Sequence, residues 1–391
     1  MKKFPESAGL GGRNDLLDNS VFEPRMIEKK LLSPTAWREL VSGRRRGLIA
    51  ILLRCCLRVP ELGYSMATWW RNRQYDLGKK AIHQAEVPVV CIGNLTVGGT
   101  GKTPMVEWIA RQFRKRDVRV AILSRGYGAE QGAKNDEALE LELALPDVPH
   151  LQNPDRVASA NVAVEELASQ LLLLDDGFQH RRLARDLDIV LLDASEPFGY
   201  DHQLPRGTLR ESLAGLSRAQ VMILSRADML GSAERQQVRT RALEYAPNAT
   251  WCEVVHSPAA LVSATQGVDP IGDLSTKRVV AFCGIGNPSG FRHTLKSLAC
   301  EPVGWHEFPD HHGYTREDVE LLAELCRCSD AELLLCTRKD LVKLRVDHIG
   351  ETPLRAVGVE LEFQSGEEEL VAILAALVHR AFSKSTLRVD E

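Results

Sequence analysis

The chain has 391 residues, with 49 basic and 53 acidic side chains and a formal net charge of −4. This near-balance argues against a protein that binds nucleic acid through bulk positive charge. The 44% hydrophobic and 26% charged fractions are typical of globular proteins and exclude disorder or fibrous repeats for most of the chain. At about 150 residues per domain, the length predicts two or three domains.

Cysteine usage and hydropathy indicate an intracellular protein. The nine cysteines include no Cys-x-x-Cys pair, which is typical of buried thiols in a reducing compartment. The best apolar run, Gly47 to Leu53, is far shorter than the roughly 20 residues of a spanning helix. The charged first 40 residues lack the apolar core of a signal peptide, so we expect neither a membrane span nor export.

The amino-terminal part of the chain divides into two predicted segments. Residues 1–40 form a polar extension without sustained periodicity, and residues 41–85 form an amphipathic segment. In the second segment, arginines alternate with bulky apolar residues and the pair Trp69 and Trp70. This composition is typical of a helix in a membrane interface, where arginines meet lipid phosphates. A helix packed on the protein's own core is the alternative.

Residues 86–276 are predicted to form an α/β core with a parallel sheet. Short β-branched or leucine-rich runs alternate with helical segments, and each run is followed by a polar loop. The predicted strands cover 87–92, 118–123, 171–174, 189–192 and 221–224. Functional loops are therefore expected at the carboxyl ends of these strands.

Residues 277–391 are predicted to form a second, smaller α/β domain. Residues 278–283 read as its first strand, and the glycine-rich segment 284–290 as a loop that leads into a helix. Residues 332–336 read as a later strand. The domain boundary is expected between residues 250 and 277.

A phosphate-binding loop is the strongest signal in the sequence. It lies between a buried strand and an amphipathic helix, where glycines allow backbone N–H groups to approach phosphate oxygens. Lys102 can reach the β- and γ-phosphates, and the Thr103 hydroxyl can bind Mg²⁺. Thr96 stands where the strict pattern has glycine, and a glycine-rich turn without a ligand is the alternative. The predicted nucleotide-binding residues are Thr96, Val97, Gly98, Gly99, Thr100, Gly101, Lys102 and Thr103.

Two adjacent acids end the buried run at 171–174. An aspartate at such a strand end holds Mg²⁺ in phosphate-loop proteins, usually through water. We assign Asp175 to the metal, together with Thr103, and Asp176 to a supporting catalytic role. An aspartate pair that only caps the following turn is the alternative.

Nine short motifs together resemble the tetraacyldisaccharide 4′-kinase family. They occur in the family's order between residues 87 and about 345, and residues 1–40 have no counterpart. The motifs are Gly93 to Pro104, Ser124 to Tyr127, Asp136-Glu137, Asn153 to Arg156, Asp175 to His180, Leu204 to Gly207 with Leu209 to Glu211, Phe282 to Pro288, Phe308 to His312 with Tyr314-Thr315, and Thr337 to Asp340.

The resemblance implies a P-loop fold and a specific reaction. The family transfers the γ-phosphate of ATP, with Mg²⁺, to the 4′-hydroxyl of a tetraacyldisaccharide 1-phosphate and forms lipid IVA for lipid A biosynthesis. An acylated acceptor stays in the bilayer, so the resemblance also implies a peripheral protein at the cytoplasmic face of the inner membrane. It favours the membrane-interface interpretation of residues 41–85 and implies no protein partner.

The resemblance also implies catalytic roles. Asp136 and His311 together activate the sugar hydroxyl, because an alcohol is a poor nucleophile until a base accepts its proton. Arg125, at a strand end, can neutralise phosphate charge, and Lys102 and Asp176 complete the predicted catalytic set. Without the resemblance, Asp136 reads as a solvated loop acid. The cluster His306, Asp310, His311 and His312 could instead hold zinc, although it lacks a distant second partner set.

Two other nucleotide-binding classes are the main alternatives. A P-loop ATPase that switches by dimerisation carries a signature lysine before the Gly-Gly pair, where this chain has Val97. A GTPase reads guanine with an Asn-Lys-x-Asp motif, and neither Ser225-Arg-Ala-Asp228 nor Thr337-Arg-Lys-Asp340 begins with asparagine. The kinase interpretation is therefore preferred.

Overall fold

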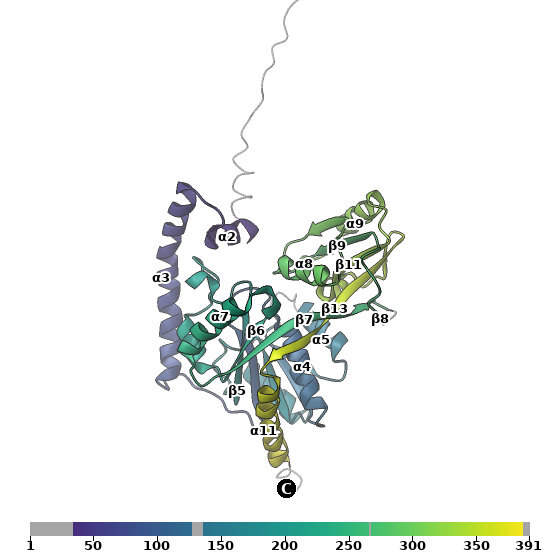
Figure 1. Cartoon of the computed structure of the whole chain (residues 1–391). Helices are drawn as coiled ribbons and strands as arrows, with labels where there is room; N and C mark the ends of the chain where they lie inside the picture. Colours follow the sequence, from purple (N-terminus) through teal and green to yellow (C-terminus); the bar gives the residue numbers. More distant parts are fainter. Residues whose placement is uncertain (1–33, 127–135, 266, 386–391) are drawn as a thin grey trace, which may run out of the picture.

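The computed structural model describes residues 34–126, 136–265 and 267–385 (Figure 1). Of the predicted polar extension, residues 1–33 lie outside the described residues, and the remainder begins helix α2 (Pro34–Val41). The segment 127–135, which contains Tyr127, also lies outside them.

The other helices are α3 (Leu48–Asp76), α4 (Lys102–Arg114), α5 (Asp136–Ala144), α6 (Arg156–Glu165), α7 (Ser232–Tyr245), α8 (Pro288–Ser297), α9 (Arg316–Cys328), α10 (Arg338–Leu344) and α11 (Glu367–Ser385), with 3₁₀ turns η1 (Gly199–Asp201), η2 (Leu213–Arg218) and η3 (Ala227–Met229).

A single mostly parallel sheet runs through the described part of the chain. Its strand order is β10-β9-β11-β13-β7-β6-β5-β1-β4-β2-β3, with β12 beside β13 and β8 beside β7. This arrangement confirms the predicted α/β fold. The strands are β1 (Val89–Asn94), β2 (Val120–Ser124), β3 (His150–Gln152), β4 (Leu171–Asp175), β5 (Leu187–Asp193), β6 (Val221–Ser225), β7 (Thr250–Val262), β8 (Val268–Pro270), β9 (Val279–Cys283), β10 (Gly304–Glu307), β11 (Leu333–Thr337), β12 (His348–Ile349) and β13 (Thr352–Ser365).

Two long antiparallel strands, β7 and β13, join the two halves of the sheet (Figure 1). We call β1 to β7 with their helices the first lobe, and β9 to β11 with α8, α9 and α10 the second lobe. Strand β13 returns the chain from the second lobe, and α11 then packs Leu370, Leu374 and Leu377 into the core of the first. The division of the chain at residue 276 stays a prediction.

Helices cover both faces of the first lobe's sheet. Strands β1, β4 and β5 are buried along their whole length, which explains their continuous apolar runs. On one face, Met105, Ile109 and Phe113 of α4 pack with α11 in one core cluster. On the other face, α6 and α7 join a second cluster around Phe178. The second lobe has its own two clusters, on opposite faces of β9 and β11.

Helix α3 has 29 residues and lies along one side of the molecule (Figure 1). Polar contacts hold its inner face. Glu61 Oε1 accepts a hydrogen bond from Gln203 N at 3.1 Å, and Tyr64 Oη donates to the Arg210 carbonyl at 2.9 Å. Large apolar side chains remain exposed on the helix: Leu48, Ile49, Ile51, Leu52, Val59, Leu62, Met66, Trp69 and Trp70. Within the described ranges, we find no helix that is both long and apolar enough to cross a bilayer.

Candidate active site

The predicted phosphate loop lies between β1 and α4, as its sequence indicates. Gly98 and Gly101 have φ values of 122° and 84°, a left-handed region that residues with side chains rarely adopt. A Cβ on Gly101 would lie 2.7 Å from Ser225 Oγ and 2.8 Å from the His256 ring. Both the backbone conformation and the close approach therefore require glycine at position 101.

Hydrogen bonds from neighbouring segments hold the outer part of the loop. The Val97 N–H donates to the Thr208 carbonyl at 2.9 Å, and Asn94 Nδ2 donates to the Thr96 carbonyl at 2.8 Å. Arg226 Nη1 donates to the Gly99 carbonyl at 3.2 Å. These contacts leave the N–H groups at the start of α4 directed at the site, where a helix N-terminus favours anions.

Lys102 is buried at the start of α4, with 9% of its surface exposed. Its Nζ donates to Asn94 Oδ1 at 3.3 Å and lies 3.4 Å from Asp176 Oδ1. The ammonium is therefore held at the strand edge beside the loop, where it can meet the outer phosphates of a bound nucleotide.

The two aspartates after β4 have opposite environments. Burial opposes ionisation of Asp176, but Lys102 and Arg210 outweigh this effect and hold its pKa well below the usual range. Arg210 Nη1 binds both oxygens of Asp176, at 2.9 and 2.8 Å. Burial, reinforced by Glu137, raises the pKa of Asp175 to about 7, although Lys102 opposes this rise. Asp176 is thus a fixed anion, and Asp175 lacks a comparable cation.

The surroundings of Asp175 fit a magnesium ion. Among the described residues, none donates a hydrogen bond to the buried Asp175 Oδ1. A buried carboxylate oxygen without a partner is costly, and a divalent cation would satisfy it. Nowhere in the described chain do three or more His, Cys, Asp or Glu side chains gather as a metal cage. Mg²⁺ needs few protein ligands, because water and phosphates supply the rest of its coordination.

Asp136 and His311 come together although 175 positions separate them in the sequence. Asp136 opens α5, and His311 lies in the loop between β10 and α9. His311 Nδ1 lies 3.1 Å from Asp136 Oδ2. This hydrogen bond raises the pKa of His311. The predicted pairing of these two side chains is therefore present in the fold.

Arg125 lies exposed at the carboxyl end of β2, close to Arg156. Burial lowers the pKa of Arg156, Arg125 adds to the decrease, and Asp176 and Asp175 oppose it. Arg156 therefore lies between the influence of Arg125 and that of the aspartate pair, and it is the more buried of the two cations. We assigned no role to Arg156 from the sequence.

Three further cations, which the sequence analysis did not single out, reach the site. Arg210 fixes Asp176, Lys339 Nζ lies 3.0 Å from Glu137 Oε1, and Lys343 Nζ lies 2.8 Å from Asp136 Oδ2. Arg210 and Lys339 occur within the quoted motifs, so those motifs could have identified them. Lys343 lies three residues beyond the motif that ends at Asp340, and no sequence pattern identifies it.

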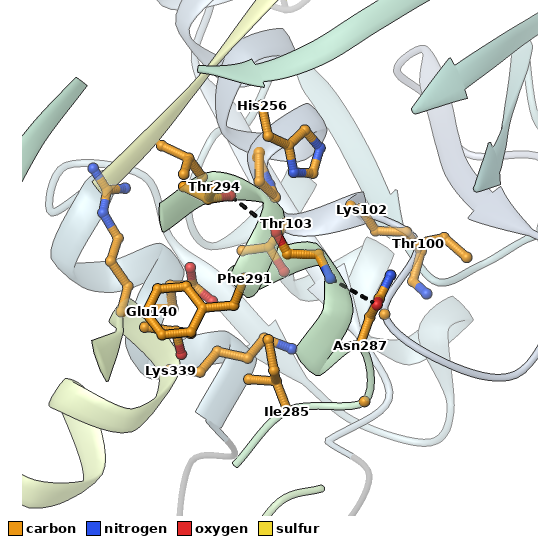
Figure 2. Close-up of a pocket in the computed structure, with 18 of the residues that line it drawn as sticks. Thr100, Lys102, Thr103, Glu140, His256, Ile285, Asn287, Phe291, Thr294 and Lys339 are labelled. Atoms are coloured by element: carbon orange, nitrogen blue, oxygen red, sulfur yellow. Dashed lines mark hydrogen bonds between the residues drawn. The ribbon is translucent and has the colours of Figure 1, made fainter. Parts of the chain in front are cut away.

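The inner part of the phosphate loop lines a cavity between the lobes, together with Glu137 and Lys339. Figure 2 shows Thr100, Lys102 and Thr103 together with Phe291 and Lys339 around it. Its apolar walls include Ile285 and Phe291 from the second lobe and Val357 and Val359 from the joining strand β13. A cavity with cationic groups and N–H donors at one end and an apolar slot beside them suits a molecule with phosphates and a flat ring.

Comparisons with known proteins agree with this geometry. The sequence profile of the family described as Tetraacyldisaccharide-1-P 4′-kinase matches residues 53–379. The chain belongs to this family. The tetraacyldisaccharide 4′-kinase of Anaeromyxobacter sp. (strain Fw109-5) is 39% identical over 327 residues, which cover 79% of this chain and 88% of the relative. That of Anaeromyxobacter dehalogenans (strain 2CP-C) is 38% identical over 358 residues, covering 87% and 93%.

A solved structure supports the same assignment. The crystal structure of LpxK from Aquifex aeolicus, in a complex with ATP, is 30% identical and superposes with a TM-score of 0.66. The match covers 83% of this chain and 99% of the relative. The predicted kinase identity is confirmed, and the alternative of a nucleotide-dependent switch is not favoured.

The position of Gly101 generates a first prediction. Gly101→Ala should weaken ATP binding more than about tenfold, because the methyl group collides with Ser225 and His256 and the left-handed backbone becomes strained. Gly78→Ala, just beyond the end of α3, is the matched control, because Gly78 also has a positive φ of 67° but a Cβ there meets nothing within 4 Å. Titration calorimetry measures both. Equal losses in the two variants would contradict the steric explanation.

Proposed function

We propose that this protein transfers the γ-phosphate of ATP to the 4′-hydroxyl of a tetraacyldisaccharide 1-phosphate. The observation that carries the proposal is the contact between Asp136 and His311 at the same sheet edge as the phosphate loop. Glu137, the neighbour of Asp136, lines the same cavity as Lys102. A phosphate donor and an activated hydroxyl could therefore meet in one place.

The phosphate loop supplies the binding site for ATP. Backbone N–H groups of residues 98–103 would surround the β- and γ-phosphates, and Lys102 would neutralise their charge. Thr103 and Asp175 would hold Mg²⁺, which screens the phosphates when it is bound. The apolar slot beside Phe291 accommodates the base.

The transfer step moves one phosphoryl group and one proton. The 4′-hydroxyl oxygen forms a bond to the γ-phosphorus while the bond from that phosphorus to the bridging oxygen of ADP breaks. The Asp136–His311 pair takes the hydroxyl proton, and ADP leaves with the electron pair of the broken bond. Arg125, Lys102 and the anion Asp176, held by Arg210, position and balance the charge around the group in transit.

The exposed apolar side of α3 is the membrane-contacting surface in this proposal. A row of exposed apolar side chains that includes two tryptophans suits the interface of a bilayer, where the acylated acceptor stays. Arg54, Arg58 and Arg73 on the same helix suit lipid phosphates. The protein then works as a peripheral enzyme at the cytoplasmic face of the inner membrane.

The kinase activity itself is tested with ATP, Mg²⁺ and the disaccharide 1-phosphate lipid in mixed micelles. Lys102→Ala should lower turnover roughly 10²-fold or more, because the charge that stabilises the transferring group is lost. Lys115→Ala, an exposed lysine beyond the end of α4, is the control and should keep its activity. A folded Lys102 variant with near-normal turnover would remove the phosphate-loop assignment.

The paired roles of Asp136 and His311 give the next prediction. Asp136→Ala and His311→Ala should each lower kcat far more than they raise the KM for ATP, because both act on the acceptor hydroxyl. The double variant should be little worse than the poorer single variant, since groups that act as a unit are not additive. His348→Ala, an exposed histidine, is the control. Fully additive losses, or losses only in the KM for ATP, would exclude a paired base.

The membrane role of α3 is tested by vesicle sedimentation. Replacing Trp69 and Trp70, which are 61% and 59% exposed, with alanine should weaken binding to phosphatidylglycerol-containing vesicles by about tenfold or more. ATP binding should not change. Leu321→Ala, at an exposed leucine of α9, is the matched control. Undiminished sedimentation of the tryptophan variant would place the anchor elsewhere in the protein.

A further inference from the structure

Lys343 contacts the same carboxylate oxygen that binds His311. Its Nζ lies 2.8 Å from Asp136 Oδ2, and His311 Nδ1 lies 3.1 Å from that atom. The Lys343 side chain is 10% exposed, so solvent screens this ion pair only weakly. Asp136 thus accepts from two donors, the His311 ring and the Lys343 ammonium.

The fold places Lys343 there through two helix ends. On α10, Lys339 and Lys343 are one turn apart and face the same way. They meet Glu137 and Asp136, the adjacent acids at the start of α5. Thr337 and Asp340 cap α10 with reciprocal hydrogen bonds, and its position is therefore well defined. The N-terminus of α5 also favours negative charge on its first residues.

We propose that Lys343 is a positioning residue of the acid–base pair: its ammonium holds the Asp136 carboxylate in place and keeps the pair free of a proton until the acceptor hydroxyl delivers one. This inference rests on the proposed function of Asp136 and His311. Lys343 acts through Asp136 and touches neither ATP nor the acceptor in this role. The pair must be unprotonated before the transfer, since it cannot otherwise accept a proton.

The charges around the pair support this role. Burial favours neutral Asp136, but the hydrogen bonds from His311 and Lys343 outweigh it and lower the pKa of this carboxyl. The bond to Asp136 and the nearby Asp310 raise the pKa of His311, whereas burial and Lys339 lower it. The charged groups that act on the pair directly are Lys343 from α10 on Asp136, and Asp310 from the β10–α9 loop and Lys339 from α10 on His311. Lys339 is in turn paired with Glu137 and influenced by Glu140, both from α5.

Removing the Lys343 charge should change the pKa values of the pair in one direction. With one cation fewer and the same anions, the pair binds a proton more tightly, so the pKa values of both Asp136 and His311 rise. The pair is then protonated over a wider range of pH. Activity is lost at neutral pH and returns at alkaline pH, where the pair gives up its proton. A purely structural role for Lys343 would lower activity equally at every pH.

The first measurement needs no kinase activity. In protein labelled at the ¹³Cε1 position of histidine, the His311 signal is assigned by its absence in His311→Ala. Its titration midpoint should lie at least about half a pH unit higher in Lys343→Met than in the wild type. Lys343→Arg, which keeps the charge, should titrate like the wild type. An unchanged midpoint in Lys343→Met would overturn the inference whatever reaction the protein catalyses.

The second measurement is the pH profile of kcat/KM for the lipid acceptor between pH 5.5 and about 9.5. The acid limb should move upward by roughly one pH unit in Lys343→Met. Below the limb, kcat/KM should fall about fivefold or more, and at the alkaline end it should fall less than twofold. Lys296→Met, an exposed lysine of α8, is the matched control. A uniform loss with an unmoved limb would overturn the inference.

One further variant and the wild-type protein separate the outcomes. Lys343→Gln removes the charge with a polar side chain, and it replaces Lys343→Met in both measurements if that variant does not fold. Its midpoint and acid limb must also rise for the inference to stand. A wild-type protein that binds ATP but phosphorylates no lipid acceptor would overturn the proposed function, while the histidine titration would still decide the role of Lys343.

Discussion

The parallel pairing of β1 with β4 and β5 is the constraint on which the site depends. In this register Ile92 lies beside Asp175, and Asn94 lies beside Leu191. Parallel strands end at one edge of their sheet, so the phosphate loop, the aspartate pair and the loop after β5 all emerge there. Lys102 can bond to Asn94 and approach Asp176 because β1 and β4 end at the same edge of the sheet. A shift of one residue between β1 and β4 would separate these groups and turn the side chains of β4 to the opposite face.

Nearby cations give the neighbouring side chains Asp175 and Asp176 different electrostatic environments. Asp175 is buried, with 2% of its surface exposed, whereas the adjacent Asp176 side chain is 33% exposed and lies beside two cations, Lys102 and Arg210. Where the effective dielectric constant is low, that difference drives the pKa values of the two carboxyls in opposite directions. Asp176 can therefore fix Lys102 and Arg210 before any ligand arrives. Asp175 keeps an oxygen without a hydrogen-bond partner among the described residues, and for this reason we propose Asp175 as the ligand of a divalent cation.

Features that depend on neighbours in the sequence could be predicted, and features that depend on distant contacts could not. The buried strands, the phosphate loop and the aspartates at the end of β4 each occupy one short segment, so periodicity and residue type identify them. The proximity of Asp136 and His311 came from family resemblance, because no local pattern links positions 175 residues apart. Lys343 was missed because its role depends on how α10 packs against α5. The packing of α11 on the first lobe was likewise hidden, since an amphipathic helix does not specify which core it covers.

The second lobe contributes to both halves of the reaction, and this links phosphate binding to hydroxyl activation. Its α10 and the loop after β10 bring Lys339, Lys343 and His311 to the start of α5. Its β9–α8 loop brings Asn287 to Asp193, which also pairs with the Arg226 that holds the phosphate loop. Both sets of contacts lie on one compact lobe joined to the first by β7 and β13. A displacement of that lobe would therefore loosen the nucleotide and disperse the acid–base pair together. Under the proposed function, the acceptor hydroxyl would therefore be activated only while the second lobe holds His311 against Asp136.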